Sequence, residues 1–165
     1  MHPHANAPRA SLKRRLATLI YDALVALAIY MAVGALFFAL FGILVANGMV
    51  DTLGQEHAVD VLQHSSFWTL VNELFKLGGV IAFFCYFWQK SGQTIGMRAW
   101  RLKLQNTDGS LISWQQGLVR TLTSAFGLMT LTMLLSSDKR ALHDKWSHSE
   151  MVELTLEQNR ARMGS

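Results

Sequence analysis

Apolar residues are concentrated in three long stretches of the chain. The first stretch runs from Leu16 to Ala46 and contains a single side chain of fixed charge, Asp22. Roughly 20 apolar residues suffice for a helix to cross a bilayer, and a surface helix of a soluble protein would show a polar stripe that this stretch lacks. The other two stretches run from Phe67 to Trp88 and from Leu118 to Leu135. We therefore predict three membrane helices, at about 14–46, 67–89 and 114–136.

The third helix is open to two interpretations, because its flanking charges do not fix the side of the C-terminus. Four Lys and Arg residues precede the first helix, none lies in 47–66, and four lie between the second and third helices. Loops rich in Lys and Arg stay in the cytoplasm. This predicts a multi-pass protein of the cell (inner) membrane with a cytoplasmic N-terminus. Residues 137–165 carry almost no net charge, so the third helix either crosses once or is re-entrant.

The polar segments complete the expected domain organisation. Residues 1–11 are predicted to form a disordered cytoplasmic tail, and 154–165 a polar C-terminal tail whose helix begins near Met151. Apolar and polar residues alternate from Trp100 to Gln105, which is the period of a strand, and a turn sequence follows at 106–109. The sequence thus predicts an all-α membrane protein with a small cytoplasmic β-hairpin at about 97–112, between the second and third helices.

Composition agrees with a membrane protein and excludes several other classes. Of the 165 residues, 51% are hydrophobic and 16% are charged, and the mean hydropathy is +0.23. The one cysteine rules out a disulfide scaffold. No catalytic or metal-binding motif is found, so we expect no enzyme activity, no cofactor and no metal. The pI of about 9.5 arises from charges beside apolar segments, which favours a bilayer with anionic headgroups over nucleic acid as partner.

Asp22 is the first candidate functional residue, because an ionisable group at membrane depth is costly and is a functional hypothesis by default. Arg15 lies seven residues earlier and shares its helical face about 10.5 Å away, too far for direct contact. Asp22 therefore needs another partner, for which Arg120, Glu73 and Lys76 are candidates, as are water, a cation or a proton. It is either a structural acid or a group that handles ions or protons.

Asp144 is the second candidate, in the charged segment 138–146 that follows the third apolar stretch. Beside His143 it is suited to a proton relay or to pairing with a basic residue. The alternative is a solvated junction that ends the membrane segment.

The order and spacing of several short motifs resemble the RDD family of membrane proteins, over about residues 12–153. The matching motifs are Arg15–Asp22, Gly92–Met97, Asp108–Gly109, Arg120 and Leu142–Asp144. The resemblance implies that Arg15, Asp22 and Asp144 are the residues that name the family. We expect these three residues to form an intramembrane polar cluster with Arg120. It also implies secondary roles for six other residues: Gln93, Thr94, Gly96, Asp108, Gly109 and His143. Segment 145–150 departs from the family, which has a small, glycine-containing stretch there.

Two functional hypotheses follow. The first is a small integral membrane protein that acts as a structural or partner-binding module, as a homo-oligomer or with a membrane partner protein. The alternative is an oligomeric transporter in which Asp22 exchanges a cation or proton, as the resemblance suggests for some relatives. Three short helices hardly enclose a pathway alone, so transport requires an oligomer.

Overall fold

The computed structural model describes residues 7–52, 54–125, 127–136 and 138–161 of the chain. It is mostly helical, with one two-stranded antiparallel sheet, β1–β2. The chain divides into two compact units: unit 1 contains Met1–Val25 and Ile81–Ser165, and unit 2 contains Ala26–Val80. In chain order the elements are α1 (Leu12–Ala46), α2 (Ala58–His64), α3 (Ser66–Ser91), α4 (Ile95–Ala99), β1 (Leu102–Asn106), α5 (Trp114–Thr123), the 3₁₀ helix η1 (Leu128–Leu135), α6 (Leu142–Trp146), β2 (Ser149–Glu153) and α7 (Leu156–Ala161).

Helices α1 and α3 are the two long helices expected from the sequence, and both are long and apolar enough to cross a membrane. At the end of α1, the Asn47 side chain donates to the Ile43 carbonyl, and Gly48 adopts a positive φ of 68°. Glycine has no Cβ and takes this left-handed conformation without strain, which explains the helix stop. The prediction of two long helices in these places is confirmed, and by length and composition both are candidate membrane spans.

Unit 2 consists of the second part of α1, the short helix α2 and the first part of α3. Its core is the buried trio Phe41, Val50 and Val61, against which Trp68 packs. Gly79 allows a close approach within this unit, since a Cβ there would lie 2.8 Å from Cγ2 of Val33.

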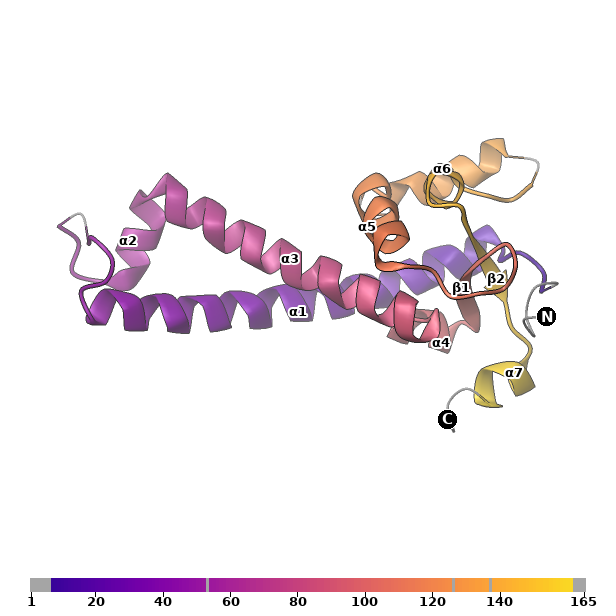
Figure 1. Ribbon diagram of the computed structural model, residues 1–165, viewed down its shortest axis with the longest axis horizontal. Coiled ribbons are helices and arrows are strands. Elements are labelled where there is room, and N and C mark those ends of the chain that lie inside the picture. Colours follow the sequence, from indigo (N-terminus) through magenta and orange to yellow (C-terminus); the bar gives the residue numbers. More distant parts are fainter. Residues whose placement is uncertain (1–6, 53, 126, 137, 162–165) are drawn as a thin grey trace. The chain divides into compact units, whose positions relative to one another are not determined.

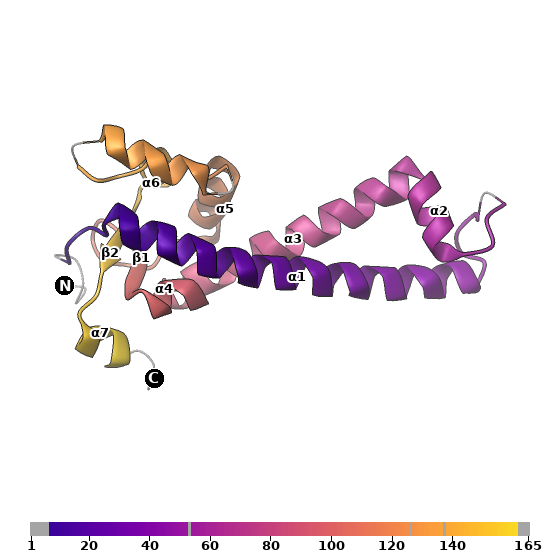
Figure 2. The ribbon, with the colours of Figure 1, turned by 180° about the vertical axis from the view of Figure 1, so that it is seen from behind.

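Unit 1 holds the sheet, and here the hairpin prediction is wrong. Strand β1 forms where the alternating pattern places it, but it pairs with β2, in the register Leu102↔Glu153 to Asn106↔Ser149. Figures 1 and 2 show the two strands side by side next to the start of α1. The turn does form, with Gly109 at a φ of 87°. The helix cap at Ser113 leaves too few residues after the turn for a return strand, because α5 begins at Trp114.

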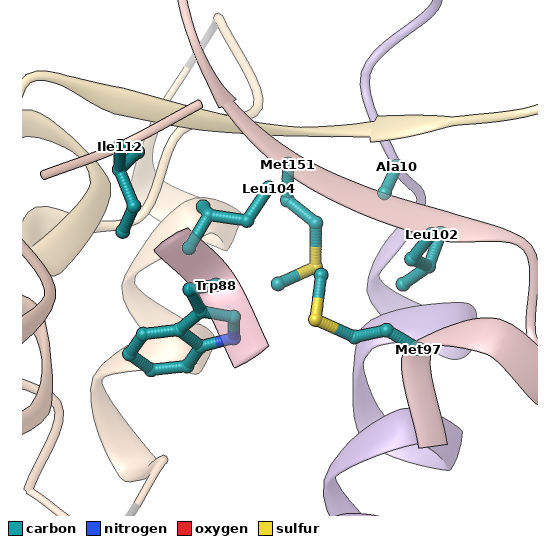
Figure 3. Packing of buried hydrophobic residues seen from close by; sticks show 7 residues of the cluster. All are labelled: Ala10, Trp88, Met97, Leu102, Leu104, Ile112 and Met151. Atoms are coloured by element: carbon teal, nitrogen blue, oxygen red, sulfur yellow. The ribbon is translucent and has the colours of Figure 1, made fainter. Parts of the chain in front are cut away.

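The core of unit 1 lies under this sheet. Leu102 and Leu104, both fully buried, point from β1 toward Met97 and Trp88. Figure 3 shows the side chains of Met97 and Met151 meeting at the centre of the cluster, with Ile112 and Ala10 at its two ends. The apolar face that the sequence places on β1 is therefore packed against protein.

The predicted third membrane helix is broken in the structure. Helices α5 and η1 are bent by 86° relative to each other. The pair is a third candidate membrane span only if two helices with such a bend are counted as a single span. The bend contains Gly127 at a φ of 89°, a conformation that ends a regular helix.

Both predicted tails are partly structured. Residues 1–6 and 162–165 lie outside the described residues, but Arg9 bridges to Val152 and Ala10 donates its amide to Met151. The polar helix expected from Met151 onward is wrong for 151–153, which belong to β2 (Ser149–Glu153); α7 follows at Leu156–Ala161.

Candidate functional site

Three elements of unit 1 each contribute one charged side chain to a buried ionic cluster. Arg15 lies in the first turn of α1, Arg120 in α5 and Asp144 in α6. Helix α5 starts at a capping box, in which Ser113 and Gln116 each accept a hydrogen bond from the backbone amide of the other. Because this box fixes the first turn, it also fixes the inward face of α5 on which Arg120 lies. We call Arg15, Arg120 and Asp144 the ionic cluster.

Asp144 is the centre of the ionic cluster. Its Oδ2 accepts from Nη1 of Arg15 at 2.6 Å, and its Oδ1 accepts from Nη1 of Arg120 at 2.5 Å. The Ala141 amide donates to Oδ2 at 3.0 Å, and Nη1 of Arg120 also donates to Oγ of Ser149 at 3.0 Å. Asp144 is 0% exposed and both arginines are 3% exposed, so the charges are removed from solvent together with their partners.

The electrostatics of α6 follow from this arrangement. Burial alone would raise the pKa of Asp144, but the guanidinium groups of Arg120 and Arg15 hold that pKa well below its usual range. Burial, followed by the charge of Arg120, lowers the pKa of His143 to about 3. The cluster thus holds two positive charges and one negative charge beside a neutral imidazole. The face of the Trp88 ring, 5.6 Å from Cζ of Arg120, compensates part of the excess positive charge.

Asp22 lies in a separate site of unit 1, at the start of helix α4. Its Oδ2 accepts from Oγ1 of Thr94 at 2.5 Å, and its Oδ1 accepts from the Gly96 amide at 2.9 Å. Thr94 is the N-cap of α4 and also accepts from the Met97 amide. A carboxylate here satisfies amides that the first helical turn leaves without partners. A Cβ at Gly96 would lie 2.7 Å from Asp22 Oδ1 and 2.8 Å from the Thr18 carbonyl oxygen, so the contact requires glycine.

The four residues of the expected polar cluster therefore form two sites. Arg15, Arg120 and Asp144 are in direct contact, whereas Asp22 is bonded to Thr94 and Gly96. Within the described part of the chain, no basic nitrogen lies within ion-pair distance of Asp22. The suggested pair of Asp22 with Arg120 is not formed, because Asp144 occupies that guanidinium.

Comparison with known proteins adds one finding to this geometry. The model of the RDD family matches residues 9–148. The chain belongs to the RDD family. No curated protein and no solved structure matches it. The RDD match includes all three members of the ionic cluster and the Asp22 site, and it ends one residue before β2 begins at Ser149. The strand that completes the sheet therefore lies outside the matched part of this RDD protein.

The remaining family-like residues of this RDD chain organise its turns and connections. Nε2 of Gln93 donates to the Leu102 carbonyl at 2.7 Å and to Oδ1 of Asn159 at 3.1 Å, which ties the end of α3 to β1 and α7. Asp108 accepts from the amide of Ser110 at 2.9 Å in the turn that contains Gly109. All of these contacts join parts of unit 1.

His143 is buried beside the ionic cluster, with Nε2 3.5 Å from Oδ1 of Asp144. This position fits neither a solvated junction nor a group open to exchange with water. The sequence suited Asp144 to a proton relay or to pairing with a basic residue. Its contacts with Arg15 and Arg120 correspond to the second role.

Two partners of Arg120 were missed by sequence reasoning. Ser149 and Trp88 support Arg120 from other elements of the chain, and only the tertiary fold brings them there.

Glu73 and Lys76, the other suggested partners of Asp22, pair with each other instead. In unit 2, Nζ of Lys76 donates to Oε1 of Glu73 at 2.6 Å, and the Tyr30 hydroxyl donates to Oε2. The spacing of three residues between Glu73 and Lys76 was the available indication of this pair.

Proposed function

We propose that this RDD protein is a structural membrane module, in which α1 and α3 anchor unit 1 at the cytoplasmic face of the bacterial inner membrane. The observation that carries the proposal is the ionic cluster. Its bonds join segments 24 and 129 residues apart in the chain, and they use both oxygens of Asp144 on protein groups. Such a network is built to hold α1, α5 and α6 together.

Asp22 supports the same role. Its carboxylate joins α1 to α4 across 72 residues through the Thr94 hydroxyl. It is 5% exposed, and each of its oxygens has a hydrogen-bond donor from the protein. Both aspartates that the resemblance assigns as family residues are thus engaged in connections inside unit 1, which favours a structural role for them.

The orientation rests on charge. The basic residues at 9–15 and 90–103 both belong to unit 1, and the segment between the helices in unit 2 has no Lys or Arg from 47 to 66. The positive-inside tendency then assigns unit 1 to the cytoplasm, where anionic headgroups attract these residues. In this position unit 1 is available to a membrane partner protein or a second copy of the chain.

A cation or proton transporter is the second candidate, favoured by one specific observation. In the described part of the chain Asp22 has hydrogen-bond donors but no basic residue within ion-pair distance. A buried acid of this kind can exchange a proton, provided that an oligomer supplies the pathway.

One experiment separates the two candidates. Wild type, Asp22→Asn and the exposed-loop control Glu56→Gln are reconstituted in vesicles, and proton flux is followed under imposed Na⁺ or K⁺ gradients. The thermal midpoint of each protein is measured in detergent. A structural role predicts no flux above empty vesicles for any protein, and a lower midpoint for Asp22→Asn alone. Flux in wild type and Glu56→Gln that is lost in a fully stable Asp22→Asn protein would establish transport instead.

Whether the protein binds a second copy of itself is tested by a separate measurement of its mass. The mass of the detergent-solubilised protein, determined by light scattering with the detergent subtracted, is expected to be a multiple of 18.5 kDa if the partner is a second copy. A mass of one chain would reject the homo-oligomer.

A further inference from the structure

Helix α5 buries its charged residue and exposes its apolar ones, the reverse of a helix on the surface of a water-soluble protein. Arg120 and Gly117 lie on its buried face, with Arg120 3% exposed. Leu118, Val119 and Leu122 lie on its outer face, where Leu122 is 71% exposed. In water, an amphipathic helix packs its apolar face on the core and leaves its charges outside. The reversed arrangement indicates that the medium around α5 is apolar.

The 3₁₀ helix η1 continues this apolar surface. A 3₁₀ helix has three residues per turn, so residues three apart lie directly above one another. Leu128, Leu131 and Leu134 form such a row, and all three are exposed. Thr130 and Met133 lie on the buried side. We call the outer leucines and valine of both helices the α5–η1 face: Leu118, Val119, Leu122, Leu128, Leu131, Leu134 and Leu135.

Three threonine hydroxyls and the backbone of the bend find hydrogen-bond acceptors within α5 and η1, which suits a hydrocarbon environment. The hydroxyls of Thr121, Thr123 and Thr132 donate to carbonyls three or four residues earlier. At the bend, the amides of residues 127–129 donate to the carbonyls of residues 124 and 125. A Cβ at Gly127 would lie 2.5 Å from Cδ1 of Leu19, so α1 covers the bend.

Length prevents either helix from crossing a bilayer. Helix α5 has 10 residues and η1 has 8, which gives each about 15–16 Å, against a hydrocarbon core of about 30 Å. Because the two helices are bent by 86°, their lengths do not add along one direction.

The sheet determines where the segment between β1 and β2 must return. Asn106 at the end of β1 is paired with Ser149 at the start of β2, so residues 107–148 leave and rejoin the protein at the same place. Arg9, just before α1, is bridged to Val152 in the same sheet. Since both β1 and the start of α1 are held there, a segment that crossed the membrane once would have to break this sheet.

Exposed residues that flank the α5–η1 face along the chain suit the headgroup region. Trp114 at the start of α5 and Trp146 in α6 are exposed, at 38% and 54%. Exposed Lys139 and Lys145 lie in the same part of the chain. Tryptophan prefers the membrane–water interface, and lysine is attracted by anionic headgroups.

We propose that α5 and η1 form a re-entrant wedge that inserts into the acyl chains of one leaflet through the α5–η1 face. The wedge enters and leaves on the side where α1 begins, so the start of α1 and helix α7 lie on the same side. The protein then crosses the membrane twice, through α1 and α3, and the partner of the α5–η1 face is lipid.

The topology is tested by labelling single cysteines in a Cys85→Ala background with a membrane-impermeant maleimide. The three positions are Ser11→Cys before α1, Glu56→Cys in unit 2 and Glu157→Cys in α7. Intact and permeabilised cells are compared. We expect the first and third positions to be labelled alike, and the second to be labelled from the opposite side. Labelling of Glu157→Cys together with Glu56→Cys, and apart from Ser11→Cys, would overturn the proposal. If all three reactivities are inverted together, the cytoplasmic orientation fails but the wedge stands.

Insertion is tested by a fluorophore at Leu122→Cys or Leu131→Cys, in vesicles of phosphatidylethanolamine and phosphatidylglycerol. Quenching is measured with lipids that carry a spin label on the acyl chain, and Glu157→Cys is the matched control. We expect strong quenching at the two leucine positions and none at the control. Absence of quenching at both leucine positions would mean that protein, such as a second copy, covers the face, and would reject lipid as its partner.

Discussion

Removing the negative charge of Asp144 is the most direct test of how unit 1 is held together. The substitution Asp144→Asn keeps the shape of the side chain but leaves two guanidinium groups without a counterion. Arg15 and Arg120 are each 3% exposed, so neither can recover full hydration without opening the fold. The loss therefore includes both the ion pairs and the cost of unpaired buried charge.

The magnitude follows from the burial. Breaking a buried ion pair by removing one partner costs about 3–5 kcal/mol, and here a single carboxylate serves two arginines. For a chain of this size, about 2–4 °C of thermal midpoint corresponds to 1 kcal/mol, which gives a decrease of roughly 6–20 °C. The assay is thermal unfolding in detergent, followed by circular dichroism and by retention of the monodisperse peak.

Glu153→Gln is the matched control, because it makes the same chemical change in a neighbouring ion pair. Glu153 pairs with Arg14 at 2.9 Å, but the two side chains are 29% and 25% exposed. A partly solvated pair contributes only about 0–1 kcal/mol, so this variant should melt within a few degrees of wild type. If both variants shift the midpoint equally, the buried ionic cluster is not what stabilises unit 1.

A double-mutant cycle adds a second criterion. Arg15→Met should be costly in wild type, because it removes one of the two arginine ion pairs of Asp144, and less costly in Asp144→Asn, where its counterion is already gone. The expected coupling is about 1–3 kcal/mol. Strict additivity of the two changes would contradict the contact.

Three further predictions concern single positions. Gly96→Ala should destabilise the protein by about 1–3 kcal/mol, because the new Cβ would meet Asp22 at 2.7 Å, whereas Gly78→Ala, with nothing within 4 Å, should be neutral or stabilising in the same melt. Acidification from pH 6.5 to pH 5 should lower stability by about 2 kcal/mol, because the unfolded chain binds a proton on His143 that the folded chain excludes, and this loss should be absent in His143→Gln. Leu104→Ala should lower the free energy of unfolding by about 2–5 kcal/mol, since this residue of the sheet core is fully buried. An unchanged thermal midpoint would show that the core repacks around the smaller side chain.

The sequence predicts the two long helices because their evidence is local. An apolar run of more than 20 residues has few alternatives to a membrane helix, and α1 and α3 lie where these runs are. The third run has the same composition but contains Gly127, which takes a positive φ and starts a 3₁₀ helix. Hydropathy counts residues and is insensitive to such a bend, so it left a single crossing and a re-entrant segment equally open, whereas the structure bends the segment by 86°.

The partner of β1 was missed for a different reason. The alternation from Trp100 to Gln105 is visible, but β2 carries Met151 and Val152 side by side, and both are buried. A strand that is buried on both faces shows no alternation and cannot be distinguished from other structures by period. The nearest apolar residues after the turn, Leu111 and Ile112, are therefore the partner that the sequence favours.

The contacts of the charged residues depend on tertiary structure even more strongly. Helical spacing correctly puts Arg15 and Asp22 on one buried side of α1, where they are 3% and 5% exposed. It could not decide which acid would pair with Arg120, because that choice depends on where the chain returns after about a hundred residues. Asp144, close to Arg120 in the chain and rigidly placed by the Ala141 amide, takes that position.

The ionic cluster and the proposed wedge are connected, because Arg120 and Asp144 lie on either side of the segment that forms the bend and η1. The two residues are 24 positions apart and meet at one carboxylate, so they close the base of the wedge, and Arg15 fixes that base to α1. Asp144→Asn should therefore do more than lower the midpoint: it should loosen η1 while α1 and α3 stay inserted. In lipid vesicles below the melting range, a fluorophore at Leu131→Cys should then lose part of its quenching by acyl-chain spin labels, whereas a fluorophore at Leu36→Cys in α1 should keep it. Unchanged quenching at both positions in a destabilised Asp144→Asn protein would show that the wedge is held by its lipid contacts rather than by its charged base.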